Sequence, residues 1–139
     1  MIWKKTLSLE KMNQLSKHSA IEHLGICFSA QGENWLEATM PINEKTIQPM
    51  GFLHGGISVA LAETVGSMAG FCCVTESQYI FGLDINANHL RPVKQGMVTA
   101  RATPLHLGNK TQVWQIEITD QQHKLCCIAR LTLSVMNYE

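Results

Sequence analysis

The apolar segment from Gly56 to about Val74 constrains the fold of this 139-residue chain more than any other feature. It is rich in alanine, lacks proline and is longer than a buried strand would be, so we expect a central helix. That helix would be apolar nearly all round, and the rest of the fold must therefore wrap it. Ala62, Gly66 and Gly70 recur every four residues and would leave a smooth face where another backbone can approach closely. A glycine costs about 1 kcal/mol in a helix interior, so this face predicts a packing contact.

Strand-like patterns flank the expected helix on both sides. They cover 26–30, 34–41, 78–90, 96–105, 111–119 and 124–135. In 78–90, alternation is expected to place every second residue from Tyr79 to His89, including Phe81 and Leu83, on one face. Leu9, Met12 and Leu15 indicate a short amphipathic helix near the start. No crossover connection is evident, so we predict a single α+β domain over residues 1–139, an antiparallel sheet of about six strands around one long helix.

Composition narrows the class of protein. Apolar residues make up 45% and charged residues only 16%, which predicts much buried surface, some of it between subunits. Lysine plus arginine and aspartate plus glutamate number 11 each, so nothing recruits nucleic acid electrostatically. No apolar run suits a signal peptide or an uninterrupted membrane span, and we expect a cytoplasmic protein with no membrane partner.

The cysteines and histidines show no spacing typical of a metal or redox site. The five cysteines include the adjacent pairs Cys72-Cys73 and Cys126-Cys127, and we expect all five to be reduced core residues. The six histidines lack zinc-site spacing, so no metal and no cofactor is expected. A serine-hydrolase elbow, a Walker loop and a dinucleotide-binding fingerprint are absent.

Two features of the central segment suggest chemistry. His54, Gly55 and Gly56 stand where the helix should begin, and a helix N-terminus with glycines can bind a substrate oxygen, although two glycines can also simply make a tight turn. Glu63 is a lone acid among apolar residues. Burying its carboxylate is costly, so it is expected in a functional cleft, in a structural ion pair or at an exposed edge of the helix.

Helix geometry relates these two features. Eight residues separate Gly55 from Glu63, which is about 12 Å along a helix axis. Reacting groups must lie within ~3–3.5 Å of one another, so the Gly55 amide and the Glu63 carboxylate of one helix cannot act on the same carbon. Two antiparallel helices could achieve this, with two equivalent composite sites across the twofold axis of a dimer.

Three further residues are weaker candidates. Ser67, four residues after Glu63, could orient the carboxylate or a water, or be a small packing residue. Gln48, in the loop before the helix, could donate its amide to a carbonyl, or be merely solvated. His89 ends an apolar strand face and could equally be a satisfied core histidine.

The motifs "QPMGFLHGGISVALAETVGSMAG", "GLDINANHLRP", "PLHLGNKTQVWQIEI" and "LCCIARLT" together resemble the hotdog-fold acyl-CoA thioesterases of the PaaI-like type. Within that family the chain is most similar to the 1,4-dihydroxy-2-naphthoyl-CoA hydrolases of menaquinone synthesis. The proofreading thioesterases of enterobactin synthesis look similar over the same stretches. The resemblance covers almost the whole chain and implies the hotdog fold.

The resemblance also implies roles for individual residues. Glu63 would be the nucleophile or general base, and the Gly55 amide of the other subunit would polarise the thioester carbonyl. Gln48 and His54 would support that carbonyl site, and Ser67 and His89 would lie in the cleft. Such enzymes are usually dimers of dimers that bind CoA at subunit boundaries, so the homotetramer is the expected assembly. The expected CoA-phosphate contacts are Arg91, Lys94 and Lys110, and the expected acyl-pocket residues are Met50 and Met68.

Two residues near the acyl pocket depart from the family pattern, since Met50 replaces a common phenylalanine and Ile57 replaces an alanine. These two departures leave the exact acyl group open. The resemblance as a whole implies an acyl-CoA thioesterase that acts on an aromatic acyl group, with 1,4-dihydroxy-2-naphthoyl-CoA as the leading substrate. The alternatives are a proofreading thioesterase on aryl carrier-protein thioesters, a hotdog hydratase or dehydratase, and a non-catalytic acyl-CoA-binding protein.

Overall fold

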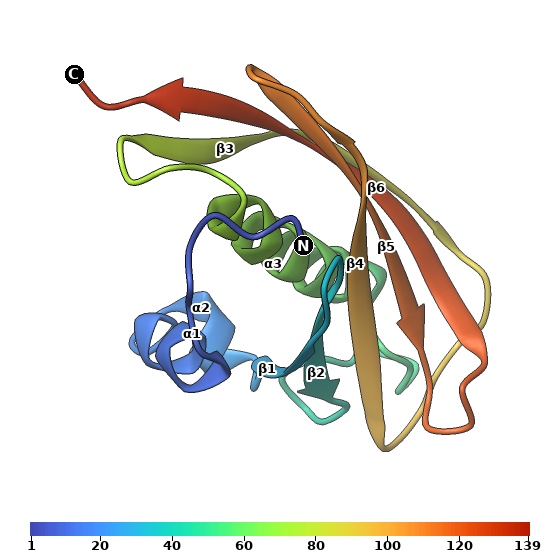
Figure 1. Cartoon of the computed structure of the whole chain (residues 1–139). Coiled ribbons are helices and arrows are strands. Elements are labelled where there is room, and N and C mark those ends of the chain that lie inside the picture. Colours follow the sequence, from blue (N-terminus) through green and yellow to red (C-terminus); the bar gives the residue numbers. More distant parts are fainter.

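The computed structural model describes residues 1–139, and Figure 1 shows the whole chain. The helices and strands are α1 (Leu9–Leu15), α2 (Ala20–His23), β1 (Cys27–Gln31), β2 (Leu36–Pro41), α3 (Gly55–Cys72), β3 (Gln78–His89), β4 (Met97–Leu107), β5 (Thr111–Thr119) and β6 (Leu125–Asn137). The expected helices near 9–15 and 56–74 and all six expected strands are present. Only α2, a single turn capped by the Ser19 side chain, was not predicted.

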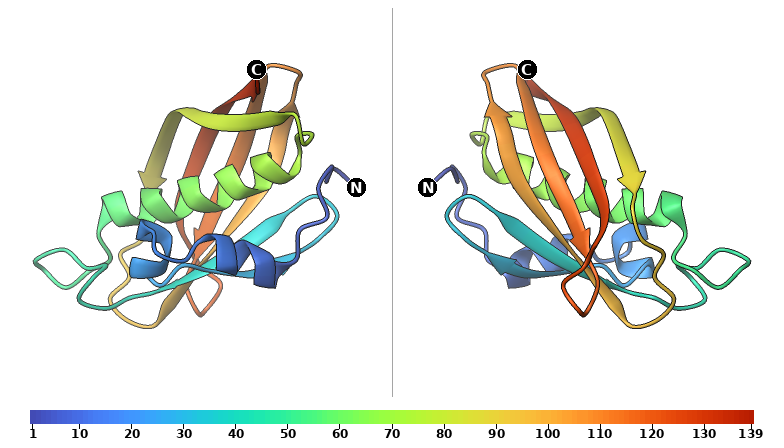
Figure 2. Two further views of the ribbon diagram at one scale, coloured as in Figure 1. Left: turned by 90° about the vertical axis from the view of Figure 1, so that its left-hand side faces the viewer. Right: turned by 90° about the vertical axis from the view of Figure 1, so that its right-hand side faces the viewer.

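The six strands form one antiparallel sheet in the order β1-β2-β4-β5-β6-β3. The sheet curls, and α3 runs along its concave side, as Figures 1 and 2 show from three directions. This arrangement confirms the predicted hotdog fold. Because β1 and β3 have a neighbour on one side only, they are the two edges of the sheet, and β3 is the longer of them.

The glycine face of α3 packs against the sheet, but side chains and not a second backbone occupy it. A Cβ built at Gly66 would lie 2.6 Å from Leu131 Cδ2, and one built at Gly70 would lie 2.6 Å from Gln112 Oε1. The buried Gln112 donates from Nε2 to the Gly70 carbonyl at 3.3 Å and accepts from Trp114 Nε1 at 2.8 Å. The predicted packing reason is therefore confirmed, with leucine and glutamine side chains as the partners.

The rest of this chain does not wrap α3 completely, contrary to the sequence expectation. The buried face carries Leu61, Ala62, Val65, Ala69 and Cys72, which belong to the core. The opposite face, from Ile57 through Glu63 to Phe71, is only partly buried. By length and composition α3 could cross a membrane, with a mean hydropathy of 1.2, yet its buried side packs in the protein core. The helix is therefore buried on its sheet side and partly exposed on the other.

The predicted alternation in β3 is wrong because it breaks at Leu83, so Phe81 does not share a face with Ile85 and Ala87. Gly82 pairs with Leu133 and Asp84 with the next residue of β6, Thr132, so Leu83 is an extra residue in a β-bulge. A one-residue insertion moves all later side chains to the other face. Ile80, Ile85 and Ala87 consequently pack on the core, whereas Phe81 and Leu83 are 59% and 61% exposed.

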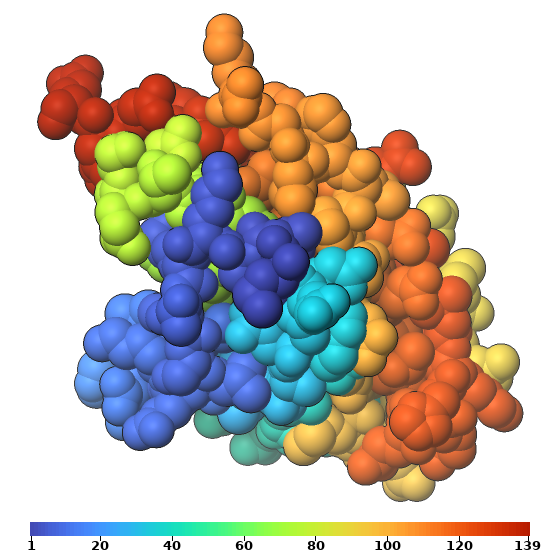
Figure 3. All heavy atoms as spheres, viewed as in Figure 1, coloured from blue at the N-terminus to red at the C-terminus, as the bar shows by residue number.

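The N-terminal segment crosses the C-terminal end of α3 in Figure 1, and its dark blue atoms lie on the surface in Figure 3. Lys5 is 9% exposed, and its Nζ donates to the carbonyls of Phe71 at 3.0 Å, Val74 at 2.9 Å and Thr75 at 3.1 Å. It also lies 4.2 Å from the Phe71 ring centroid. No basic residue lies in the last turn of α3, so Lys5 supplies the cation that this end of the helix dipole favours.

We predict that Lys5→Met lowers the free energy of unfolding by about 2–3 kcal/mol, because it leaves helix-end carbonyls buried without their charged donor. Urea unfolding followed by circular dichroism measures the change. The neighbouring Lys4→Met is the matched control, since the exposed Lys4 side chain makes no hydrogen bond. Equal unfolding midpoints for the two variants would contradict the assignment.

Four of the five cysteines are buried as expected, but Cys27 is exposed. Burial raises the pKa of Cys72 to about 11 and that of Cys73 to about 12, so both thiols stay protonated at neutral pH. No disulfide is present among the five. The Cys27 thiol is therefore the one that a thiol reagent reaches in the folded chain.

Candidate active site

The N-terminus of α3 presents one free backbone donor. His54 is the N-cap, and its Nδ1 accepts from Gly56 N at 2.9 Å. The His54 carbonyl accepts from Ile57 N and Ser58 N at 3.1 and 3.0 Å. Gly55 N–H is left without an acceptor, at the positive end of the helix dipole. The capping geometry thus isolates the amide that the sequence singled out as the oxyanion donor.

The loop before α3 holds the Gln48 side chain, whose amide is a second potential donor. Gln48 Oε1 accepts from Met50 N at 2.5 Å and from Phe52 N at 3.3 Å. Gln48 N also donates to the Phe52 carbonyl at 2.8 Å, and Gly51 completes the turn at φ 90°. Because its oxygen is held by the backbone, the amide Nε2 of Gln48 is available to donate to a ligand.

A cavity of about 310 Å³ lies beside this helix end and is lined by Gln48, His89 and Arg91, among others. His89 comes from the end of β3, and a Cβ built at Gly55 would lie 3.0 Å from His89 Nε2. The His89 imidazole therefore lies close to Gly55, and a side chain at residue 55 would displace it slightly. The structure brings Gln48, His54, Gly55 and His89 together at one end of α3.

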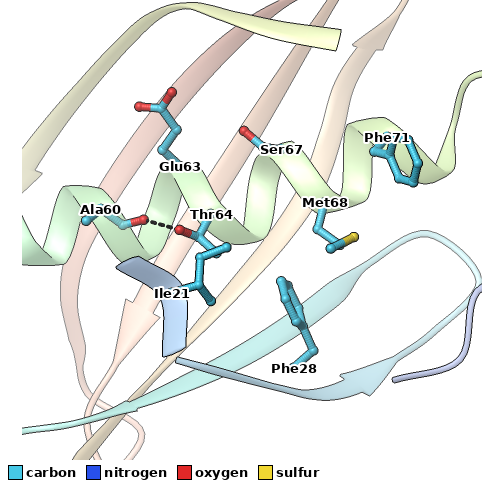
Figure 4. A pocket seen from close by; sticks show the side chains of 8 residues that line it. All are labelled: Ile21, Phe28, Ala60, Glu63, Thr64, Ser67, Met68 and Phe71. Atoms are coloured by element: carbon cyan, nitrogen blue, oxygen red, sulfur yellow. Dashed lines mark hydrogen bonds between the residues drawn. The ribbon is translucent and has the colours of Figure 1, made fainter. Parts of the chain in front are cut away.

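Glu63 lies in a different cavity, of about 460 Å³. Figure 4 shows the eight side chains that line it: Ile21, Phe28, Ala60, Glu63, Thr64, Ser67, Met68 and Phe71. Glu63 and Ser67 point to one side of the helix, while Met68 and Thr64 point toward Phe28 and Ile21. The cavity thus has a polar side and an apolar side.

Glu63 has no partner within the chain. The single salt bridge joins Arg101 to Glu37, so the structural ion-pair alternative for Glu63 does not hold within one subunit. Its side chain makes no hydrogen bond and is only partly buried. Ser67 Oγ is likewise unbonded and is positioned on the polar side next to Glu63. A carboxylate that has no hydrogen-bond or ion-pair partner and lies in a partly apolar cavity is suited to act on a ligand.

The two sets of predicted residues do not meet in one chain. Gln48 and His89 line the cavity at the helix N-terminus, and Glu63, Ser67 and Met68 line the cavity at its middle. About 12 Å of helix separates Gly55 from Glu63, beyond the reach of one glutamate side chain. Each chain therefore carries two separate groups of candidate residues.

The basic residues predicted to contact CoA phosphates lie at opposite ends of α3. Arg91 lines the cavity at the helix N-terminus, and Lys94 Nζ lies 5.4 Å from the ring centroid of the nearby Phe52. The pKa of Asp120 is lowered, first by the backbone N–H of Lys124 and further by the charge of Arg91. Lys110 lies in the β4–β5 turn, at the opposite end of α3, where Gln112 bonds Gly70.

Met50 is 73% exposed in the turn before α3 and lines neither cavity. It therefore does not belong to the acyl pocket within one chain. Ile57, the other departure from the family pattern, is partly buried and packs against the core.

Sequence reasoning missed most of the apolar wall of the Glu63 cavity. Ala60, Thr64 and Phe71 lie three or four residues from Glu63, Ser67 and Met68, so helical spacing alone could have found them. Phe28 and Ile21 come from β1 and the unpredicted α2, and no local signal links them to α3. No three His, Cys, Asp or Glu side chains lie close enough together to hold a metal ion.

Comparisons with known proteins identify the family of this chain. Residues 50–127 match the model of the thioesterase superfamily. A solved thioesterase of Haemophilus influenzae superposes with a TM-score of 0.97 at 63% identity, covering 99% of this chain and 96% of the other. A Pasteurella multocida protein with an esterase name is 76% identical over the full length of both chains.

Two relatives with different activities are equally similar. The 1,4-dihydroxy-2-naphthoyl-CoA hydrolase of Escherichia coli (strain K12) is 48% identical over 98% of this chain and 100% of its own. The proofreading thioesterase EntH of Cronobacter turicensis is also 48% identical, over 98% and 99%. The names of both relatives describe enzymes that hydrolyse thioesters. Because the fold, the family match and these relatives agree, the chain is a thioester hydrolase that belongs to the thioesterase superfamily.

Proposed function

We propose that the protein hydrolyses an aromatic acyl-CoA thioester at composite sites between two subunits, with 1,4-dihydroxy-2-naphthoyl-CoA of menaquinone synthesis as the leading substrate. The observation that carries the proposal is the split site. A free Gly55 N–H with the Gln48 amide forms one half, and an unpartnered Glu63 beside an apolar cavity forms the other. Neither half is complete without a second copy of the chain.

The exposed parts of the fold support this dimer. The outer edge of β3 is unpaired over its whole length, and Phe81 and Leu83 expose large apolar side chains beside it. Unpaired strand edges are ready to pair with another chain. The partly exposed face of α3, which carries Glu63, also needs a covering surface. A twofold dimer of antiparallel helices would cover both and set Gly55 of one subunit near Glu63 of its partner. A dimer of such dimers in the cytoplasm is the assembly we propose.

In the proposed reaction the thioester carbonyl oxygen accepts from Gly55 N–H and Gln48 Nε2, which stabilise the negative charge that develops there. His54 maintains this geometry, because its Nδ1 caps Gly56 and leaves the Gly55 donor free. Glu63 of the partner either takes a proton from water, which attacks the carbonyl carbon, or attacks it directly to form an anhydride that water then opens. The C–S bond breaks, CoA leaves as the thiol, and the acyl group becomes the carboxylic acid.

The Glu63 cavity supports an aromatic acyl group. Phe28, Phe71 and Met68 supply flat and adaptable apolar surface, and aromatic and thioether groups pack well against a ring. The free Ser67 hydroxyl on the polar side could bind a ring hydroxyl. At the helix N-terminus, Arg91 and Lys94 could bind CoA phosphates, with Lys110 of another subunit as a third candidate.

A panel of thioesters tests the proposal. We expect kcat/KM at least tenfold higher for 1,4-dihydroxy-2-naphthoyl-CoA and benzoyl-CoA than for hexanoyl-CoA and palmitoyl-CoA, measured as thiol release with a thiol reagent. A Cys27→Ser variant removes the accessible protein thiol from the signal. Faster turnover of an aryl carrier-protein thioester would favour the proofreading role. Binding of CoA esters without thiol release would indicate a non-catalytic binding protein.

A further inference from the structure

The row of β3 residues that faces α3 has one position without a side chain. Ile80, Ile85 and Ala87 pack against the core, and Gly82 pairs with Leu133, whose side chain is fully buried. Directly paired residues of an antiparallel ladder face the same side of the sheet. Gly82 therefore faces α3 and leaves a gap in this row, which we call the Gly82 notch.

The carboxylate of Glu63 occupies the Gly82 notch. A Cβ built at Gly82 would lie 2.5 Å from Glu63 Oε2 and 3.5 Å from Glu63 Cδ. Apart from the neighbouring residues of β3, no other heavy atom would lie within 4 Å of it. Figure 4 shows the Glu63 side chain extending from α3 toward the yellow-green ribbon of β3. Glu63 makes no hydrogen bond or salt bridge in the chain, and its carboxylate has this position because residue 82 has no side chain to exclude it.

The backbone does not explain the glycine. Gly82 is not among the glycines with positive φ, so a residue with a side chain could adopt its conformation. Glycine weakens a strand interior, and a glycine there often marks close approach of another group. The group that approaches is Glu63. The bulge at Leu83 follows immediately, so Gly82 is the last inward position before the register changes.

We propose that Gly82 is a positioning residue for Glu63, which keeps the carboxylate in the orientation that attacks the thioester or activates water. This inference rests on the proposed function of Glu63. An ordinary contact between a Cβ and an oxygen begins near 3.4 Å, so any side chain at residue 82 displaces Oε2 by about 0.9 Å. A misplacement of about 1 Å can reduce catalysis by ~10²-fold.

The test uses Gly82→Ala and Gly82→Val in the full-length protein. We expect kcat to fall by about 10- to 100-fold with KM changed less than threefold, because Gly82 itself lines neither cavity. The melting temperature should stay the same or rise, because β-branched residues favour strands and the displaced group is the mobile end of one side chain. Asn86→Ala, on the outer face of β3, is the same-strand control and should retain the wild-type kcat.

A second comparison separates positioning from a general defect. In a Glu63→Asp background the carboxylate is one methylene shorter and no longer reaches the notch. Gly82→Ala should then cost less than threefold in kcat relative to Glu63→Asp alone. An equal loss in both backgrounds would show that Gly82 acts by another route and would overturn the inference.

Failure of the inference and failure of the proposed function have different signatures. If Glu63→Gln is inactive but Gly82→Ala turns over within twofold of wild type, the positioning role is wrong and the catalytic role of Glu63 stands. If Glu63→Gln is itself fully active, the proposed function fails and the inference fails with it.

Discussion

Glu63→Gln is expected to lower kcat by about 10²–10⁴-fold, the range that a positioned acid or base contributes. Glutamine has the same shape and fits the same cavity, but its amide neither accepts a proton from water nor attacks a carbonyl. Because Glu63 makes no ion pair or hydrogen bond in the chain, the substitution leaves no buried partner unsatisfied. Steady-state hydrolysis of the best ester of the panel measures the loss.

The same chemical change at an exposed acid provides the control. Glu76 lies beyond the end of α3 and is exposed, so Glu76→Gln should keep the wild-type kcat and melting temperature. Turnover by Glu63→Gln at the wild-type rate would remove Glu63 from the mechanism. Single turnover in ¹⁸O-labelled water distinguishes the two mechanisms that remain open, since label enters Glu63 only if an anhydride forms.

Gly55→Pro is expected to reduce kcat by about 10²–10³-fold, the usual effect of removing one oxyanion-hole donor. Proline lacks the N–H and is favoured at the first position of a helix, so the substitution removes the donor with little cost to α3. His54, at φ −68° and ψ 130°, already has the extended conformation that a following proline requires. Gly55→Ala keeps the N–H and measures the steric share of the effect, since a Cβ there lies 3.0 Å from His89 Nε2.

Pairing a Gly55→Pro chain with a Glu63→Gln chain in one dimer tests whether the active sites are shared between subunits. In a heterodimer of Gly55→Pro and Glu63→Gln chains, one site carries both lesions and the other carries neither. Heterodimers isolated by two different affinity tags should therefore recover about half of the wild-type activity. If each chain held a complete site, every site in the heterodimer would carry a lesion and the preparation would stay inactive. That outcome would refute the split-site proposal.

The local patterns of the chain predicted most of its elements because each element buries one face. The long alanine-rich run indicated α3, and alternation indicated six strands within a few residues of their ends. The α2 turn has too few residues for a periodic signal. In β3 the alternation continued through the sequence, but the bulge at Leu83 broke it in space, because a bulge depends on the partner strand and not on local propensity.

By itself, the sequence determined the candidate groups and a length: a helix-end glycine amide, a lone carboxylate eight residues later, and the fixed rise of a helix that keeps them apart. Only the tertiary structure decided what surrounds them. The cap that leaves Gly55 N–H free and the turn that holds Gln48 are made by hydrogen bonds between residues two to four apart. The apolar wall from β1 and α2 and the Gly82 notch depend on contacts between residues distant in the chain. Such contacts arise from packing of the sheet around α3, which no local pattern of residues encodes.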